Sequence, residues 1–172
     1  MKTTTYSGNI NDFQLPELVK KTNKTSIILS IVLIIFALAI FHLVYLTENN
    51  LVEGSEVFAG VIALGVALFM LIWQRTKFID KETGSVVSKD RIYYNPNDLP
   101  TILLAFDNDN FAVLQNVKRQ QEGNVQIVFR FAENHRYIAV QVQRYEPFDY
   151  KPQTDILVYR DANAMKLMEN LK

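Results

Sequence analysis

Two long runs of apolar residues dominate the first half of the chain. Residues 26–46 and residues 57–73 contain no charged side chain. As an α-helix rising about 1.5 Å per residue, the first run would extend about 31 Å, which matches a bilayer hydrocarbon core of about 30 Å. The second run lies at the short end of the spanning range of about 17–25 residues. Neither has the polar face of a buried hairpin in a soluble protein, so the pattern predicts two transmembrane helices.

The first run also contains a motif that resembles a signal-peptide cleavage site, Ala37-Leu38-Ala39. Apolar sequence continues beyond it as far as Leu46, and some twenty-five residues precede the run. Both features are typical of an anchor that is retained and not cleaved.

The charges around the two runs predict an orientation. The flanking basic residues are Lys20, Lys21, Lys24, Arg75, Lys77 and Lys81. The connecting segment, residues 47–56, has three Glu and no Lys or Arg. The positive-inside bias therefore places both termini in the cytoplasm and this acidic loop outside the cytoplasmic (inner) membrane. The plain hairpin and the absence of Cys suggest a bacterial source.

This orientation divides the chain into three parts. Residues 1–25 form a cytoplasmic N-terminal segment, residues 26–74 the transmembrane hairpin, and residues 75–172 a cytoplasmic domain. Pro16 suits the first turn of a helix. The N-terminal segment is therefore expected to be either a short interfacial helix or a flexible tail.

Small residues form a stripe on the second predicted helix, and they let helix backbones approach closely. The stripe contains Ala59, Gly60, Ala63 and Ala67, and the first run offers Ser26, Ser30 and Ala37. It either closes the hairpin on itself or contacts a homo-oligomer or another membrane subunit. His42 lies about one turn from the outer end of its run, where it reaches interfacial water or serves a proton or ion role.

Beyond Arg75 the hydrophobic period shortens to that of strands. Residues 76–80 and 85–94 predict two strands of a hairpin. The turn at residues 95–98 opens a helix to about residue 106, which Asn97 or Asp98 can cap. The run at residues 111–117 is ambiguous between helix and strand.

Two strands with strict alternation follow, at residues 123–132 and 136–144. Ile138, Val140 and Val142 line one face of the second strand, with Gln141 and Gln143 on the other. A short polar turn between alternating runs indicates an antiparallel pair.

The end of the chain predicts a loop at residues 146–154, a strand at 155–160 and a helix capped by Asp161. The apolar positions of that helix are Ala162, Met165, Met168 and Leu171. We expect an α+β domain with an antiparallel sheet of four to six strands, one face covered by two helices, and a C-terminal helix. This layout is similar, in element order only, to membrane-anchored pleckstrin-homology-like bacterial proteins.

The sequence offers little material for catalysis or cofactor binding. Asp107-Asn108-Asp109-Asn110 begins like a calcium loop, but the fifth, sixth and twelfth positions are Phe111, Ala112 and Lys118, so a helix-ending turn is expected. His135 lies alone in a predicted turn. We therefore expect no enzyme, no cofactor and no metal. The net charge of zero gives no argument for nucleic acid as a partner.

Two features suggest binding instead. Tyr145, Phe148 and Tyr150 lie in a proline-containing loop, where they form a partner surface or cover the end of the sheet. Arg75, Lys77 and Lys81, with Lys89 and Arg91 further on, could contact anionic headgroups, although the positive-inside rule alone also explains basic residues at this place.

The sequence therefore predicts an interaction protein anchored in the lipid bilayer. It would act as an accessory or scaffold subunit of a cytoplasmic-membrane complex, holding a protein partner or a second copy of itself. The alternative is a membrane-tethered sensor that binds a lipid headgroup or a small ligand through its cytoplasmic domain. A small oligomeric channel is a further alternative.

Overall fold

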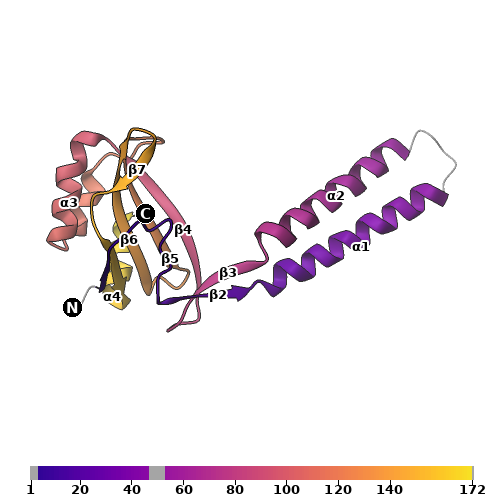
Figure 1. Cartoon of the computed structure of the whole chain (residues 1–172), viewed down its shortest axis with the longest axis horizontal. Coiled ribbons are helices and arrows are strands. Elements are labelled where there is room, and N and C mark those ends of the chain that lie inside the picture. The colour runs from indigo at the N-terminus through magenta and orange to yellow at the C-terminus, as the bar shows by residue number, and fades with distance from the viewer. Residues whose placement is uncertain (1–3, 47–52, 172) are drawn as a thin grey trace. The chain divides into compact units, whose positions relative to one another are not determined.

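The computed structural model describes residues 4–46 and 53–171. The chain forms two compact units, one made of Met1–Val19 with Phe78–Lys172 and the other of Lys20–Lys77. The first is called the sheet unit below and the second the helical unit. Figure 1 shows the helices and strands of both.

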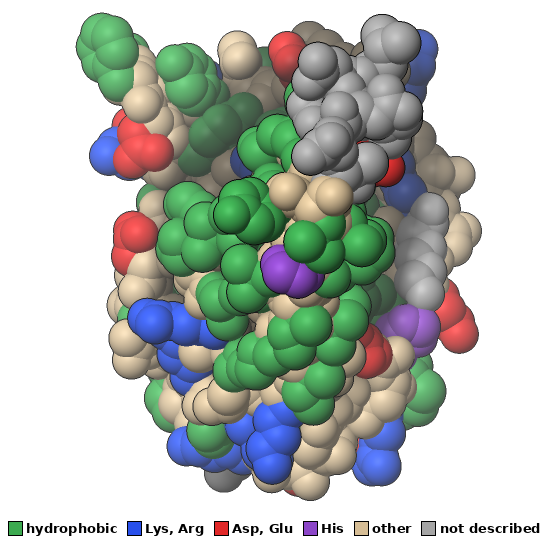
Figure 2. Space-filling view, turned by 90° about the vertical axis from the view of Figure 1, so that its right-hand side faces the viewer, with side chains coloured by type: hydrophobic (Ala, Val, Ile, Leu, Met, Phe, Trp, Pro, Cys, Tyr) green, Lys and Arg blue, Asp and Glu red, His purple; other side chains and the backbone are tan. Residues whose placement is uncertain are grey.

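The helical unit contains two long apolar helices, α1 (Lys24–Leu46) and α2 (Glu53–Trp73), packed against each other. Both are long and apolar enough to cross a membrane. Most of their exposed side chains are apolar, and hydrophobic side chains gather on the face shown in Figure 2. Helix α2 begins four residues before the predicted span, and residues 47–52 of the predicted loop lie outside the described residues.

Eight strands form one sheet, in the order β1-β8-β6-β5-β4-β3-β2, with β7 paired to β6. The pairs with a recorded register are all antiparallel. The strands are β1 (Thr4–Tyr6), β2 (Leu18–Thr22), β3 (Thr76–Asp80), β4 (Val86–Tyr94), β5 (Val125–Ala132), β6 (Tyr137–Glu146), β7 (Asp149–Pro152) and β8 (Ile156–Arg160). The predicted antiparallel pair is confirmed as β5 and β6, but the prediction of four to six strands was too low.

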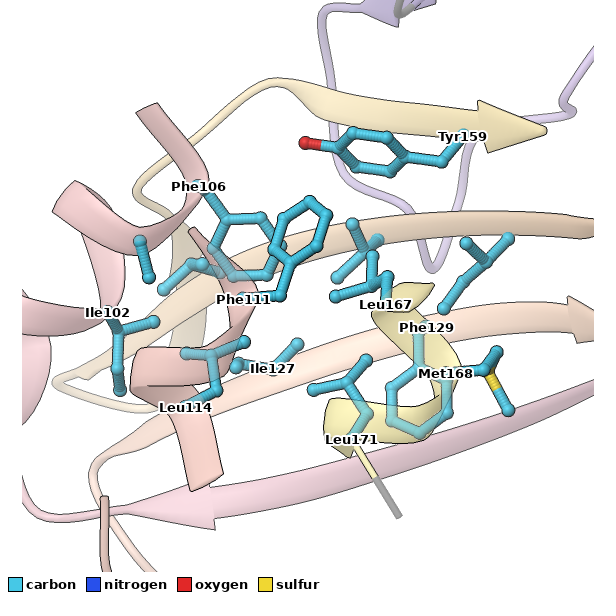
Figure 3. Close-up of a cluster of buried hydrophobic side chains, with 14 of the residues drawn as sticks. Ile102, Phe106, Phe111, Leu114, Ile127, Phe129, Tyr159, Leu167, Met168 and Leu171 are labelled. Atoms are coloured by element: carbon cyan, nitrogen blue, oxygen red, sulfur yellow. The ribbon is translucent and has the colours of Figure 1, made fainter. Parts of the chain in front are cut away.

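One face of the sheet is covered by helices. They are η1 (Pro96–Asp98), α3 (Leu99–Asp107), η2 (Phe111–Asn116) and α4 (Asp161–Leu171), where η denotes a 3₁₀-helix. Their apolar side chains form a core with Ile127 and Phe129 of β5, and Phe111 packs edge-to-face on Tyr159 of β8 at 5.3 Å between ring centroids (Figure 3). The ambiguous run at residues 111–117 is thus largely a 3₁₀-helix, and the predicted C-terminal helix is confirmed.

The opposite face is also covered, contrary to the expectation of one polar, solvated face. Ile10 and Leu15 of the N-terminal segment are buried there against Val128, Ala139 and other residues of β5, β6 and β8. The N-terminal segment forms β1 and β2 with turns between them, so the expectation of a helix or a flexible tail was wrong. The conformation of the N-terminal segment depends on long-range contacts with the sheet, which a local sequence pattern does not reveal.

Buried glutamines attach this segment to the sheet. Gln141 and Gln143, expected on a solvated face, are fully buried. The side chain of Gln141 accepts a hydrogen bond from the Ile10 N–H at 2.9 Å and donates to the Gly8 carbonyl at 2.7 Å. Gln143 donates to Asn9 Oδ1 at 3.0 Å. The side chains of Gln141 and Gln143 thus form hydrogen bonds with the N-terminal segment that water would form if this face of the sheet were exposed.

Three local predictions need correction. The expected loop at residues 146–154 contains the strand β7. Asp98 precedes α3 but its side chain makes no capping hydrogen bond, whereas Asn95 caps η1. In α4 the buried positions include Ala164 and Leu167, while Ala162 and Met165 are exposed. The three-residue step used for the prediction drifts away from the 3.6-residue period of a helix.

Candidate functional site

Phe148 lies at the tip of the β6–β7 hairpin and is 96% exposed. Glu146 pairs with Asp149, so Pro147 and Phe148 are the two residues of the turn. Phe148 has φ of 77°, a region that bulky side chains rarely adopt and that normally favours Gly. A proline followed by a residue with positive φ is the pattern of a type II turn. The hairpin therefore holds an aromatic ring in water on a strained backbone.

The two tyrosines predicted with Phe148 lie at the base of the same hairpin. Tyr145 and Tyr150 are opposite each other in the β6–β7 pair, with ring centroids 5.3 Å apart in an edge-to-face arrangement. The Tyr150 hydroxyl donates to the Gly123 carbonyl at 2.6 Å. Tyr145 is 45% exposed. The structure thus brings all three predicted residues together, with the tyrosines supporting the hairpin and only Phe148 projecting fully from it.

The small-residue stripe of α2 lies largely inside the helical unit. Gly60, Ala63 and Ala67 are buried, whereas Ala59 is exposed. A Cβ added at Gly60 would lie 2.7 Å from the ring of Phe41 on α1. Ser26, Ser30 and Ala37 are the buried residues of α1. Three of the four stripe residues therefore serve the contact between α1 and α2.

The predicted headgroup residues are spread along the chain between α2 and β4. The backbone carbonyl of Arg75 accepts from the Asn23 N–H at 2.8 Å, within the helical unit. Lys77 is a half-buried residue of β3. Lys81 is exposed in the β3–β4 turn of the sheet unit, and its N–H donates to the Glu17 carbonyl at 2.9 Å. The recorded contacts do not join these three residues into one site.

A more compact basic site lies on β4 and β5 of the sheet unit. Lys89 and Arg130 are direct cross-strand partners, and they line a cavity of about 110 Å³ with Phe78, Val87 and Ser88. Like charges directly opposite each other destabilise a sheet. Burial lowers the pKa of Lys89, and the positive charges of Arg130 and Arg91 lower that pKa further. Sequence reasoning placed Lys89 only in a general basic set and missed Arg130, because the strand register was unknown.

Neutral oxygen atoms of the N-terminal segment hold both cations. The guanidinium of Arg130 donates to the carbonyls of Ile10 at 2.5 Å, Asn11 at 3.3 Å and Phe13 at 3.3 Å. Lys89 Nζ donates to Asn11 Oδ1 at 2.7 Å. The ion pairs recorded among the described residues involve neither cation. The carboxylate of Asp12 raises the pKa of Lys89, but this is the smallest of the contributions to that pKa.

A buried ion pair fixes the β3–β4 turn. Asp80 is fully buried, and its carboxylate accepts from Thr83 Oγ1 at 2.7 Å and from Arg160 at 3.1 Å. Burial by itself would raise the pKa of Asp80, but the hydrogen bonds from Thr83 and Arg160 outweigh it and lower the pKa. Arg160 also pairs with Glu82 at 2.6 Å and lies over the ring of Tyr137. This cluster ties the turn to β8.

The remaining predicted chemistry is accounted for by local structure. Residues 107–110 end α3 in a turn, with Asp109 at φ of 51°, as expected. His135 lies in the β5–β6 turn, and His42 is exposed on α1. In the part of the chain that the structure describes, no group of three or more His, Asp or Glu could hold a metal ion. A second cavity, of about 210 Å³, lies beside Leu104 and Asn108 and is lined by uncharged residues.

Comparison of the chain with protein-family models, with curated proteins and with solved structures found no match in any of the three. We therefore infer function from the residues of this chain alone.

Proposed function

We propose that this chain is a membrane-anchored interaction protein, an accessory or scaffold subunit of a cytoplasmic-membrane complex. In this proposal α1 and α2 span the bilayer, both termini lie in the cytoplasm, and the sheet unit holds a protein partner through the β6–β7 hairpin. The proposal depends on one observation about Phe148. Its aromatic side chain is almost completely exposed, and its backbone has a positive φ that is unfavourable for a bulky residue. Such backbone outliers cluster at active sites and ligand-binding sites.

The division into units supports the two-span topology. The sheet unit contains residues from before α1 and after α2. A folded unit lies on one side of a bilayer, so the chain between Val19 and Phe78 crosses an even number of times. If α1 spans the membrane, α2 must span it too. The basic residues that flank the helices support a cytoplasmic location for the side on which the sheet unit lies.

The position of the hairpin favours a protein partner over the bilayer. Strand β6 begins at Tyr137, beside Arg160 and the Asp80 cluster, and ends at Glu146. At about 3.3 Å per residue the hairpin tip is about 30 Å from that end of the sheet. The sheet unit resumes at Phe78, two residues before Asp80, and the Lys81 N–H donates to the carbonyl of Glu17, two residues before the other boundary at Val19. Phe148 therefore lies far from both chain boundaries within its own unit. Aromatic residues are enriched in the cores of protein interfaces.

Site-specific crosslinking would test the partner. We would introduce a photoreactive phenylalanine analogue at position 148 of the full chain in its native membrane, with position 104 as the control, because Leu104 is 59% exposed on α3. A crosslink to one distinct protein from position 148 and not from position 104 is the expected result. The same products from both positions, or none from position 148, would contradict the proposal.

Cysteine labelling would test the topology, because the chain has no Cys. Single cysteines at Asn49 and Met165 would be exposed to a membrane-impermeant maleimide in intact cells. Labelling at position 49 alone is expected. Labelling of position 165 before the cells are opened would overturn the cytoplasmic orientation.

A second candidate function is sensing of a lipid headgroup or small ligand by the sheet unit. The cavity beside Lys89 and Arg130 is the specific observation that favours it.

A further inference from the structure

Two cations face each other across the β4–β5 pair, and none of the ion pairs recorded among the described residues joins either one to a carboxylate. Lys89 and Arg130 are direct partners, and Arg91 follows Lys89 on the same face of β4. Their recorded hydrogen bonds go to neutral oxygen atoms of residues 10, 11 and 13. A sheet with like charges opposite each other is less stable than one with a balanced pair. An anion between the two side chains would remove this repulsion.

The cavity at this place has the chemistry of a phosphate site. Its volume of about 110 Å³ exceeds the roughly 30 Å³ that a water molecule occupies in the liquid. Arg130 uses three of its five N–H donors, at most, on the three recorded backbone carbonyls. The remaining donors and the ammonium of Lys89 suit an anion with several acceptor oxygens. Burial is the main cause of the lowered pKa of Lys89, and the positive charges of Arg130 and Arg91 lower that pKa further.

One wall of the cavity is apolar. Phe78 and Val87 are paired across β3 and β4, on the same side as Lys89 and Arg130, and Phe78 is 43% exposed. A small hydrophilic anion would not contact an aromatic side chain favourably. A phosphate that carries glycerol and acyl groups would, because its apolar part can pack on the ring of Phe78 while Lys89 and Arg130 bind the phosphate.

The chain keeps this cavity close to the end of α2. Phe78 follows Trp73 by five residues, so the two are at most about 18 Å apart in any arrangement of the units. If α2 spans the membrane, as proposed above, the cavity lies within reach of the cytoplasmic headgroups, where anionic lipids concentrate.

The orientation rule does not account for Arg130, although it covers Lys89, which follows the end of α2 by 16 residues. The positive-inside bias acts within about 15–20 residues of a membrane helix. Arg130 follows the end of α2 by 57 residues, and it reaches the cavity only through the strand register. A basic residue at this position therefore needs a different explanation from Arg75 and Lys77.

We propose that the cavity lined by Phe78, Lys89 and Arg130 binds the phosphate of an anionic phospholipid headgroup. The inference rests on the membrane anchoring proposed above, but it does not involve the β6–β7 hairpin. It makes the sheet unit responsive to the charge of the cytoplasmic leaflet, because a bound headgroup bridges β4, β5 and the N-terminal segment that Arg130 holds.

The test uses the full chain in non-ionic detergent with three soluble probes, dioctanoyl phosphatidylglycerol, dioctanoyl phosphatidylcholine and inorganic phosphate. Binding is measured by native mass spectrometry and by the shift in thermal unfolding followed by circular dichroism. Phosphatidylglycerol is expected to bind saturably and at least fivefold more tightly than phosphatidylcholine. Inorganic phosphate is expected to compete only weakly.

Matched variants assign the binding to the cavity. Lys89→Gln and Arg130→Gln are expected to reduce the affinity for phosphatidylglycerol at least fivefold. Lys118→Gln, which removes one charge from an exposed lysine of the η2–β5 connection, should leave it unchanged. Because Arg130 also holds the N-terminal segment, its variant is interpreted only if its circular dichroism spectrum is native. The Lys89 variant decides the result on its own.

Three results would overturn the inference. They are equal binding of the two lipids, full affinity in Lys89→Gln, and equally tight binding of inorganic phosphate, which would assign the cavity to free phosphate. None of these depends on membrane insertion or on a partner protein, so they are distinct from a failed crosslink at position 148 or a wrong topology.

Discussion

The carboxylate of Asp80 lies 3.1 Å from the guanidinium of Arg160, eighty residues further along the chain. Asp80 is the last residue of β3, and Arg160 is the last residue of β8. The pair is a long-range tie beside the point where the chain re-enters the sheet unit after α2. Several measurable consequences follow from it and from the other contacts described above.

Replacing Asp80 with Asn should lower the free energy of unfolding by about 1.5–3 kcal/mol, the range for hydrogen bonds to charged groups. Arg160 would keep Glu82, which is 62% exposed, but would lose its buried partner. Urea unfolding of the detergent-solubilised chain would measure the change. Asp155→Asn is the matched control, since Asp155 is exposed. Equal effects from both variants would contradict a special role for Asp80.

The same carboxylate should make stability depend on pH at the acid end. The pKa of Asp80 is lower in the folded protein than its ordinary value of 3.8. The unfolded chain therefore takes up a proton first, so the contribution is fully present above about pH 4 and is lost as pH falls below this value. Unfolding midpoints between pH 7 and pH 3 should converge for the wild type and Asp80→Asn. Parallel curves over that range would show that Asp80 is not the group responsible.

Replacing Gln141 with Leu should loosen the N-terminal segment. The buried Ile10 N–H would lose its partner, at a cost of about 1–3 kcal/mol, and a second hydrogen bond would be lost at the carbonyl of the exposed Gly8, at a smaller cost. Hydrogen exchange at Ile10 should accelerate while exchange in β5 changes less. Gln153→Leu is the control, because Gln153 is exposed. Unchanged protection at Ile10 would mean that apolar packing alone holds the segment.

Replacing Gly60 with Leu should disrupt the contact between α1 and α2. A Cβ at this position already lies 2.7 Å from Phe41, so a larger side chain forces the helices apart. Gly65→Leu is a matched control, since a Cβ there meets nothing within 4 Å. Crosslinking between cysteines placed at Ala37 and Ala63 should fall in the Gly60 variant only. Loss of crosslinking in the Gly65 variant would instead place a second contact on that face.

Two substitutions of Phe148 should separate backbone strain from binding. Gly relieves the cost of the left-handed conformation and Ala does not, so Phe148→Gly should be about 1 kcal/mol more stable than Phe148→Ala. Both remove the ring and should weaken partner capture alike. Chemical unfolding and co-purification from native membranes would measure the two effects. Retention of the partner by both variants would exclude the ring as a contact.

The sequence predicted the elements with strong periods. The uncharged runs indicated two long apolar helices, and alternation around Ile127 and Val140 indicated the central antiparallel pair. Both patterns are local, because a side chain's direction follows from its place in a helix or strand. The sequence also predicted that Tyr145, Phe148 and Tyr150 lie close together, because they are aromatic residues of one short segment.

What the sequence did not predict depends on pairing between distant segments. Gln141 and Gln143 alternate with apolar residues as a solvated face would, yet the N-terminal segment buries them. Alternation indicates two faces but does not tell whether a polar face meets water or the backbone of another segment. Arg130 was missed as a neighbour of Lys89 because only the register joins them.

The N-terminal segment cannot fold as soon as it is synthesised, because the strands that it packs on are made later. Ile10 is made before Gln141, which accepts its N–H and follows 131 residues later. At a synthesis rate of about 5–20 residues per second, this delay is roughly 6–26 s. During that time the segment has no sheet to join, and its apolar side chains are open to other binders. This segment is therefore made before the strands that it packs on, and it reaches its final position only after they are made.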